Sequence, residues 1–422
     1  MNAQVPARLA AALAAAPSDR LVLDLTGMAD AYRRLTRELP GAAVRFAVKS
    51  CPVDEVLTCL AEVGAGFDAA SPAEIAQVLR LGVPARLIHY GNTVKSDAEI
   101  AEAHRLGIRT FATDSVEDVT AVAAQAPGAR VFCRLATSGD GALWGLSHKF
   151  GCSPDDAVRV LTAARAAGLT PAGLSVHVGS QQMTAEAWTE AAETLADTLL
   201  ALREHGIAPD HVNLGGGLPA AGYLDRRGRP LEPPLDKMFA VIRDGMDRLR
   251  HVNGGPLAFV VEPGRHLVAD HGAIRAHVSR LTTRRGPGGR DARWLYLSVG
   301  KFNGLYEMDQ LCHRLVFPGR TPGEDRVPAV VAGPTCDSDD AYADPAQRVP
   351  RGLASGDPVW ILSAGAYATS YMTRGFNGFP PLPYAWAAGD GKGDATPAAP
   401  ATRPAAARDA APAAVPAEGR ER

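Results

Sequence analysis

Eight short apolar runs, spread over residues 44–264 and each followed by a helix-like stretch, constrain this sequence more than any other feature. The runs are VRFAVK (44–49), GFDAAS (66–71), LIHYG (87–91), RTFATDS (109–115), RVFCRLAT (130–137), PAGLSVHVG (171–179), HVNLGGG (211–217) and LAFVVEPG (257–264). Buried parallel strands are apolar along their whole length, and eight strand–helix units are what a (β/α)8 barrel requires. We therefore predict an α/β fold built on a TIM-like barrel.

The stretches between the runs carry helix signals at both ends. SPAEIAQVLRLG (71–82) and SPDDAVRVLTAARAAG (153–168) each begin with Ser and Pro, continue with an acidic residue, and end at Gly. Ser caps the first turn, Pro suits the first helical position, and Gly ends a helix. These signals predict helices on the outside of the barrel.

Outside the eight strand–helix units, the sequence pattern changes. Residues 266–386 contain short alternating runs separated by turn residues, which predicts a mainly β domain, a β-barrel or β-sandwich. We expect residues 1–25 to form a short helix and a strand, RLVLDL (20–25), that joins this β domain, and residues 26–265 to form the barrel. Residues 387–422 are rich in Pro, Ala and charge, and we expect them to be disordered.

The composition of the chain limits the classes of partner that we expect. The 422 residues are 46% hydrophobic and 21% charged with a net charge of −2, so neither nucleic acid nor a membrane is an expected partner. The Ala-rich N-terminus is interrupted by Arg8 and does not resemble a signal peptide. Six scattered cysteines without CxxC or zinc-finger spacing indicate reduced thiols, no metal site and a cytoplasmic protein. A small molecule is the expected partner.

Reactive side chains of a (β/α)8 barrel lie at the C-terminal ends of its strands. Reading only those ends gives Lys49, Asp68, Arg134, His177, Gly215, Gly216, Gly217, Glu262 and Arg265. A lysine at the end of a buried strand is costly when charged, which favours a neutral amine that can attack an aldehyde. The alternative is a solvated lysine at the rim.

The other strand ends allow two interpretations each. The glycines of LGGGLP and Arg265 of EPGR suit a phosphate group, although three glycines also form ordinary turns. Glu262 suits a protonated pyridine nitrogen, or an ion pair with a local arginine. His177 suits stacking on a flat cofactor, or the core of the barrel.

These residues occur in stretches that resemble a known family. FAVK, GAGFDAASPAEI, HVGSQ, NLGGG, EPGR, GPTCDSDD and GAYATSYMTRGFNGF occur in the order seen in the fold-type III pyridoxal-phosphate (PLP) decarboxylases of the ornithine and diaminopimelate group. The resemblance covers about residues 20–384. It implies a PLP-binding barrel, a β domain, and a head-to-tail homodimer whose active sites contain residues of both subunits.

The resemblance also implies residue roles. Lys49 would be the Schiff-base lysine, His177 would stack on the ring, and Glu262 would pair with the pyridine nitrogen. The phosphate ligands would be Ser180, Gly215, Gly216, Gly217, Arg265 and Tyr367, with Asp68 and Arg134 near the cofactor.

The residues that contact the substrate would come from the β domain. Cys336 would reach the partner's site and protonate the carbanion left by CO2, and Asp337 would bind a distal ammonium group. The alternatives without a role in catalysis are a small buried thiol for Cys336 and a polar turn for residues 337–340. In KFNGLYEMD either Glu307 or Asp309 would supply a second substrate carboxylate.

Decarboxylation of L-ornithine to putrescine is the function we expect, as in polyamine biosynthesis. Lysine or arginine is a close alternative, and the family's Cys-Glu pattern for diaminopimelate differs from the Cys-Asp found here. Another alternative is a decarboxylase of a biosynthetic cluster that acts on an amino acid tethered to a carrier. A noncatalytic regulator of the same fold is a further alternative, but such relatives tend to lose the lysine or the phosphate ligands, which this chain keeps.

Overall fold

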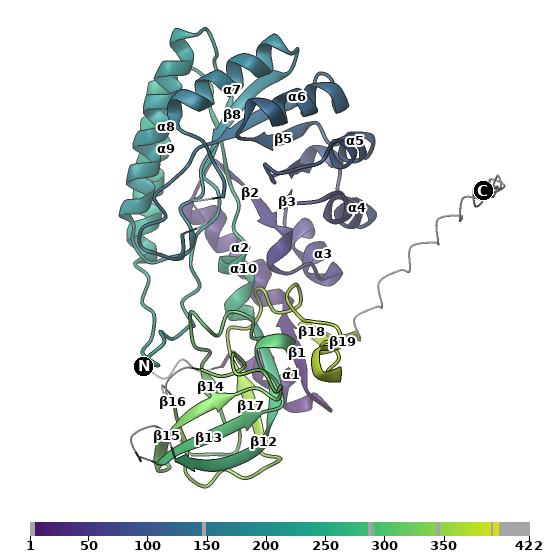
Figure 1. The fold of residues 1–422 in the computed structure, drawn as a ribbon, viewed down its shortest axis with the longest axis vertical. Helices are drawn as coiled ribbons and strands as arrows, with labels where there is room; N and C mark the ends of the chain where they lie inside the picture. The colour runs from purple at the N-terminus through teal and green to yellow at the C-terminus, as the bar shows by residue number, and fades with distance from the viewer. Residues whose placement is uncertain are drawn as a thin grey trace, which may run out of the picture.

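The computed structural model describes residues 5–389 except 146–148, 286–288, 290, 322 and 343–346, and in addition the strand at 391–395. A barrel occupies one end of the molecule and a β-sheet domain the other (Figure 1). No helix in the described ranges has both the length and the apolar composition needed to cross a bilayer.

The predicted barrel is confirmed. Its eight parallel strands close in the order β10-β11-β2-β3-β4-β5-β6-β8. They are β2 (Ala42–Ala47), β3 (Gly66–Ala69), β4 (Ile88–Tyr90), β5 (Thr110–Thr113), β6 (Arg130–Arg134), β8 (Thr170–Ser175), β10 (His211–Asn213) and β11 (Ala258–Val261). Each strand coincides with one of the eight apolar runs, because both of its faces are covered.

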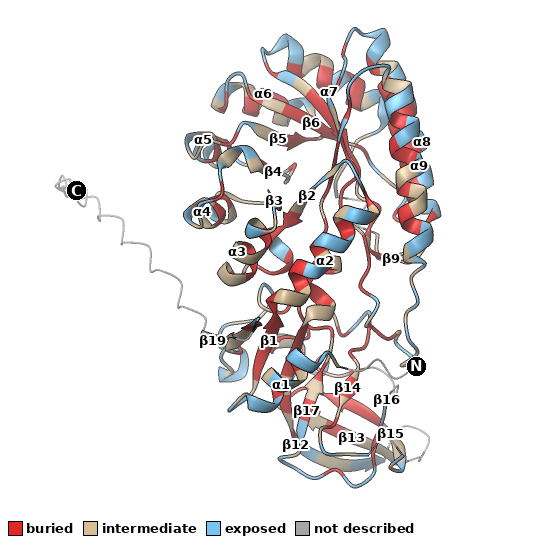
Figure 2. Ribbon diagram, turned by 180° about the vertical axis from the view of Figure 1, so that it is seen from behind, coloured by how far each residue is buried: buried red, intermediate tan, exposed pale blue. Residues whose placement is uncertain are grey.

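Helices surround this barrel, and their exposed faces point away from it (Figure 2). They are α2 (Leu25–Glu38), α3 (Asp54–Glu62), α4 (Pro72–Arg80), α5 (Asp97–Arg105), α6 (Val116–Gln125), α7 (Pro154–Ala166), α8 (Glu186–Glu204), α9 (Leu235–Asn253) and the short α10 (Arg265–Val268). The predicted caps form, since Ser71 accepts from Glu74 N at α4 and Ser153 accepts from Asp156 N at α7.

The β domain is a curled sheet of nine strands with the main order β16-β15-β13-β12-β1-β18-β19. The strands are β1 (Arg20–Asp24), β12 (Gly272–Arg285), β13 (Asp291–Leu297), β14 (Leu315–Val316), β15 (Arg326–Ala332), β16 (Gln347–Pro350), β17 (Pro358–Ile361), β18 (Tyr384–Ala388) and β19 (Gly391–Ala395). β17 pairs with β12 and β14. Two further strands, β7 (Ala142–Trp144) and β9 (Ser180–Gln182), pair apart from both sheets.

The first strand of the chain belongs to this distant sheet. β1 pairs antiparallel with β12 and parallel with β18, and α1 (Ala7–Ala15) packs Leu9 and Leu13 against Val22 of β1 and Ala273 of β12. The chain thus enters through the β domain, builds the barrel and returns, which brings loops of the β domain to the barrel rim.

Two local predictions are corrected. The stretch after Gly264 begins with α10 and a 3-10 turn (Ala269–His271), and the strand starts only at Gly272. The predicted tail starts too early, because β18 runs to Ala388 and pairs antiparallel with β19. Residues 396–422 lie outside the described part of the chain.

Candidate active site

A cavity of about 520 Å³ opens where the C-terminal ends of the barrel strands meet the β domain. Its lining includes Lys49, Asp68, Arg134, Trp144, Phe150, His177, Ser180, Arg265, Tyr306, Glu307, Asp309, Tyr367 and Tyr371. A small hollow of about 20 Å³ lined in part by Lys49, His177, Ser180, Gly216, Gly217, Glu262, Arg265 and Tyr367 adjoins it. The structure therefore gathers most of the predicted site residues in one place.

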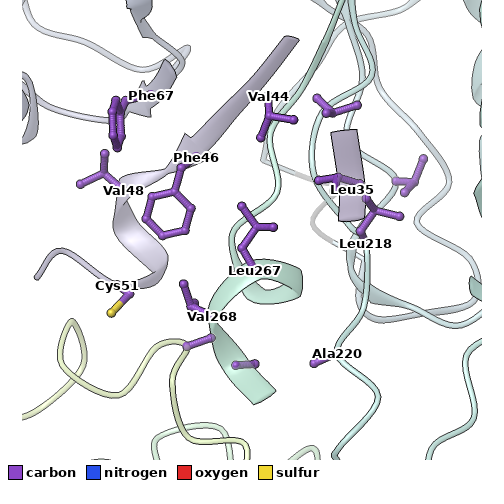
Figure 3. Packing of buried hydrophobic residues seen from close by; sticks show 14 of the residues in the cluster. Leu35, Val44, Phe46, Val48, Cys51, Phe67, Leu218, Ala220, Leu267 and Val268 are labelled. Atoms are coloured by element: carbon purple, nitrogen blue, oxygen red, sulfur yellow. The ribbon is translucent and has the colours of Figure 1, made fainter. Parts of the chain in front are cut away.

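Lys49 and Arg265 stand on two short helical segments that share a core. Lys49 lies in a 3-10 turn (Val48–Ser50) directly after β2, and Arg265 begins α10. Figure 3 shows Phe46, Val48 and Cys51, around Lys49, near Leu267 and Val268 of α10. Shared packing holds the two segments that carry Lys49 and Arg265 against each other.

The predicted neutral state of Lys49 is wrong for this structure. Its Nζ lies 3.6 Å from Asp68 Oδ2, and its side chain is 48% exposed to the cavity. Burial lowers the pKa of Lys49, but the attraction of Asp68, with smaller contributions from Tyr367 and Glu262, outweighs burial and raises it. Lys49 is therefore a cation held by a carboxylate.

Asp68, the residue before the last of β3, contacts Lys49 and is almost fully buried. Burial alone would raise its pKa, but Lys49 and then His89 lower it well below the usual range. A Cβ atom at Gly91 would come within 1.9 Å of Asp68 Oδ1, so only glycine leaves room for this carboxylate.

Arg265 is buried under aromatic rings and pairs with an acidic side chain. Its two terminal nitrogens donate to Glu307 Oε2 at 2.6 Å and Oε1 at 2.7 Å. One of them also donates to Ser180 Oγ at 3.2 Å, and the guanidinium lies over the ring of Tyr367 at 4.8 Å. Glu307, predicted as a substrate ligand, thus holds the arginine predicted for phosphate.

The glycine loop leaves its backbone accessible beside this arginine. Gly215 and Gly217 have φ angles of +68° and +109°, in the region that favours glycine. A side chain on Gly216 would approach the carbonyl oxygen of Glu262 to 2.8 Å and His177 Nε2 to 3.1 Å. Tyr367 also has a positive φ, +55°, and its backbone N–H donates to Ser50 O at 2.7 Å. Such strain is typical of functional positions.

His177 presents a neutral ring to the cavity. Its Nδ1 accepts a hydrogen bond from Gly179 N at 3.1 Å. Burial, with the nearby cations Arg134 and Lys49, lowers the pKa of His177 to about 3. A neutral imidazole suits contact with the face of a flat ring.

Glu262 follows β11 and is held by two neighbours. Asn213 Nδ2, at the end of β10, donates to Oε1 at 2.5 Å, and His89 Nε2 lies 2.7 Å from the same oxygen. Among the described residues, the ion pair that Glu262 forms within 4 Å is with His89 and not with an arginine, although Arg45 and Arg134 lie near enough to attract the carboxylate. Arg134, at the end of β6, instead stacks over Phe150 at 5.0 Å.

The segment with Cys336 and Asp337 does not line the Lys49 cavity of its own chain. Cys336 is exposed, so it is not a small buried hydrophobe, and its backbone N donates to Asn377 Oδ1 at 2.9 Å. Asp337 accepts from Asp339 N in a polar turn, whereas the buried Asp340 clamps Lys301 N and Thr335. Within one chain these residues and Lys49 are not brought together.

Sequence reasoning missed several lining residues and one buried histidine. Trp144, Tyr306 and Tyr371 line the cavity but belong to loops or to the small β7–β9 sheet, which had no barrel signal. His89 lies inside β4 and was read only as part of an apolar run. The one available signal was a polar residue directly before the end of a buried strand.

Comparisons with known proteins agree with this geometry. Residues 25–269 match the family model described as "Pyridoxal-dependent decarboxylase, pyridoxal binding domain". A lysine/ornithine decarboxylase of Selenomonas ruminantium is 32% identical over 366 residues, covering 86% of this chain and 88% of the relative.

Solved structures show the same similarity. The crystal structure of lysine decarboxylase from Selenomonas ruminantium superposes with a TM-score of 0.78 at 28% identity, covering 91% of this chain and 96% of the other. The lysine/ornithine decarboxylase of Vibrio vulnificus, complexed with putrescine, gives a TM-score of 0.76 at 28% identity, covering 90% and 96%. A mutant of SrLDC in complex with PLP gives 0.80 at 29% identity, covering 91% and 95%.

Proposed function

The chain belongs to the pyridoxal-dependent decarboxylases, and from that premise we propose that it decarboxylates L-ornithine to putrescine and CO2. Its membership and its relatives establish a PLP-dependent enzyme that decarboxylates a basic amino acid. Ornithine as the preferred substrate, the role of each site residue and a homodimer in the cytoplasm are parts of the proposal.

The residues present fit PLP. The hollow next to Arg265 combines a buried guanidinium, the Ser180 hydroxyl and the accessible backbone at Gly216 and Gly217, which suits a phosphate group. The neutral His177 ring faces the space beyond it, and Glu262 lies where a pyridine nitrogen could bind a carboxylate. Lys49 supplies the amine. When bound, PLP supplies a ring system that accepts the electron pair released as CO2 leaves.

Asp68 controls the protonation of the Lys49 amine. The carboxylate holds Lys49 as a cation, so the lysine must lose a proton before its nitrogen can act as a nucleophile. The partial exposure of Lys49 gives that proton a route to water. The ion pair orients the amine within the cavity.

The observation that carries a basic substrate is the pair of acidic side chains in the lining of the cavity. Glu307 and Asp309 line the same cavity as Lys49, while the cations Arg134 and Arg265 lie on the barrel side. A terminal ammonium group is attracted to the acidic end. With Arg265 occupied by phosphate, Glu307 is available to the substrate, and its reach beyond Asp shortens the space in favour of ornithine over lysine.

We assign the proton donor to Cys336 and a second ammonium ligand to Asp337, both from the partner subunit of a homodimer. The exposure of Cys336 and its absence from the cavity of its own chain support this assignment. A thiol at an exposed edge is able to deliver a proton to a reacting carbon.

A CO2-release screen tests the function. The purified, PLP-loaded protein should release CO2 from L-ornithine faster than from L-lysine, L-arginine or meso-diaminopimelate, and norvaline should be a poor substrate. Faster release from lysine would overturn the argument from Glu307. Activity on diaminopimelate alone would overturn the assignment of Asp337.

A further inference from the structure

His89 is a fully buried histidine in contact with both carboxylates of the site. It lies in β4, with an exposed fraction of 2%. Its Nε2 is 2.7 Å from Glu262 Oε1 and 3.3 Å from Asp68 Oδ1. Within the described chain neither Nε2 nor Asp68 Oδ1 makes a well-aligned hydrogen bond, although Nε2 is within ionic range of both carboxylates.

The surroundings make this contact ionic. Burial lowers the pKa of His89, but Asp68 and Glu262 outweigh burial and raise it above its usual value. A neutral imidazole offers a single N–H on this side, which can align with only one oxygen, whereas the positive charge of an imidazolium attracts both.

Other charged groups around the cluster are mostly cations. Arg45 on β2, Arg134 on β6 and Lys49 interact with the same two carboxylates. The ring of Phe132 on β6 separates His89 from His211 on β10, at 5.2 and 5.6 Å between ring centres. No further acid shared with His89 is recorded among the described residues, so Asp68 and Glu262 are its counter-charges.

We propose that His89 is a positioning residue that holds a proton between Asp68 and Glu262, keeping Asp68 directed at Lys49 and Glu262 directed at the cofactor ring. The inference rests on the proposed function, because Glu262 and Lys49 have these roles only in a PLP decarboxylase. Two other roles are distinguishable by experiment. His89 could serve only as a ring packed against Phe132, or the three side chains, whose ligand atoms lie within 4.8 Å of one another, could bind a cation.

The first experiment examines the proton directly in the cofactor-free protein. Protein labelled with 15N-histidine is titrated by NMR, and His89 is identified by the signal missing from His89→Gln. An ordinary histidine loses its proton near pH 6.5. We expect His89 to remain cationic above that pH in the wild type, and to titrate at lower pH in Glu262→Gln. A neutral His89 at pH 6.5, or a bound stoichiometric metal ion in the purified protein, would overturn the proposal.

The second experiment measures function in the PLP-loaded enzyme. His89→Phe keeps a ring for Phe132, and His89→Gln keeps a donor without a charge. We expect both variants to bind PLP with kcat/KM for CO2 release reduced about tenfold or more at pH 6.5. His211→Asn removes the histidine on the other side of Phe132 and should retain wild-type kcat/KM.

The pH dependence separates a charge role from packing. Wild-type His89 is cationic below its raised pKa and neutral above it, whereas Gln is neutral throughout. The ratio of wild-type to His89→Gln kcat/KM should therefore fall as pH rises through that pKa. A ratio that does not change with pH, or wild-type activity in His89→Phe, would contradict the proposal. If the wild type itself released no CO2, the proposed function would fail, while the NMR result would still decide the state of His89.

Discussion

The two walls of the cavity are built in different ways. The barrel wall, formed by Lys49, Asp68, Arg134 and His177, lies at the ends of buried strands, and the ion pair between Lys49 and Asp68 at 3.6 Å joins two of these strands. The β-domain wall consists of Tyr306, Glu307, Asp309, Tyr367 and Tyr371, all on loops, with Tyr306 and Tyr371 partly exposed.

This difference suits the two walls to different functions. Side chains on closely packed strand ends keep a fixed geometry, which suits cofactor chemistry. Loop side chains are easier to change without disturbing the core, which suits selection among substrates. We therefore expect substitutions in the barrel wall to remove activity, and substitutions in the five loop residues of the β-domain wall to change cofactor binding and substrate preference.

The largest effect should come from the amine of the barrel wall. Lys49→Ala removes the nucleophile and leaves Asp68 without its cation, so CO2 release should fall by on the order of 10³-fold or more. The visible absorbance of the PLP-loaded protein should disappear in the same variant. Unchanged turnover in Lys49→Ala would overturn the whole assignment of the site.

A mixing experiment asks whether a partner subunit adds Cys336 to this cavity, both walls of which belong to one chain. Lys49→Ala and Cys336→Ala should each be inactive, but their mixture should recover activity, because a hybrid dimer contains one site with both residues intact. Lys49→Ala mixed with Glu262→Gln is the matched control, since both residues lie in one barrel and no hybrid site is intact. No recovery despite demonstrated subunit exchange would contradict shared sites.

A smaller effect is expected for substrate preference. A buried carboxylate left without a cation costs about 2–5 kcal/mol, so ornithine should exceed norvaline in kcat/KM by roughly 30-fold or more. Asp337→Ala should remove most of that preference and leave PLP binding unchanged. Asp339→Ala, an equal loss of charge in the same segment, should keep it. Equal preferences in wild type and Asp337→Ala would exclude Asp337 as the ammonium ligand.

The sequence was sufficient for the barrel because buried parallel strands and capped helices are local patterns. All eight apolar runs became barrel strands, and Ser71 and Ser153 cap the helices as expected. Domain boundaries were less accessible, since β19 and the last two residues of β18 lie in a stretch whose composition indicates disorder.

Errors at the site arose where side chains of different strands meet. The apolar strand before Lys49 predicts a neutral amine, but the parallel pairing of β2 with β3 places Asp68 beside it. His89 was overlooked for the same reason, since its two acidic neighbours come from β3 and from the end of β11. The charge of a buried group depends on such neighbours, which no local pattern contains.

The smallest effect tests the contact that joins the two walls. Glu307 holds Arg265 in the place expected for a phosphate group, so PLP must displace this carboxylate to bind. A hydrogen bond to a charged group contributes about 1.5–3 kcal/mol, and an amide is a weaker partner for a guanidinium than a carboxylate. Glu307→Gln should therefore bind PLP about tenfold more tightly, at 1.4 kcal/mol per tenfold, in an equilibrium titration of the visible absorbance.

Asp309→Asn is the matched control, because it removes the same charge from the same cavity. Among the described residues Asp309 makes no contact with Arg265, so the PLP affinity of this variant should match the wild type. Equal gains in both variants would mean that only the cavity's total negative charge opposes the phosphate, and an unchanged affinity in Glu307→Gln would show that Arg265 and Glu307 do not compete with it.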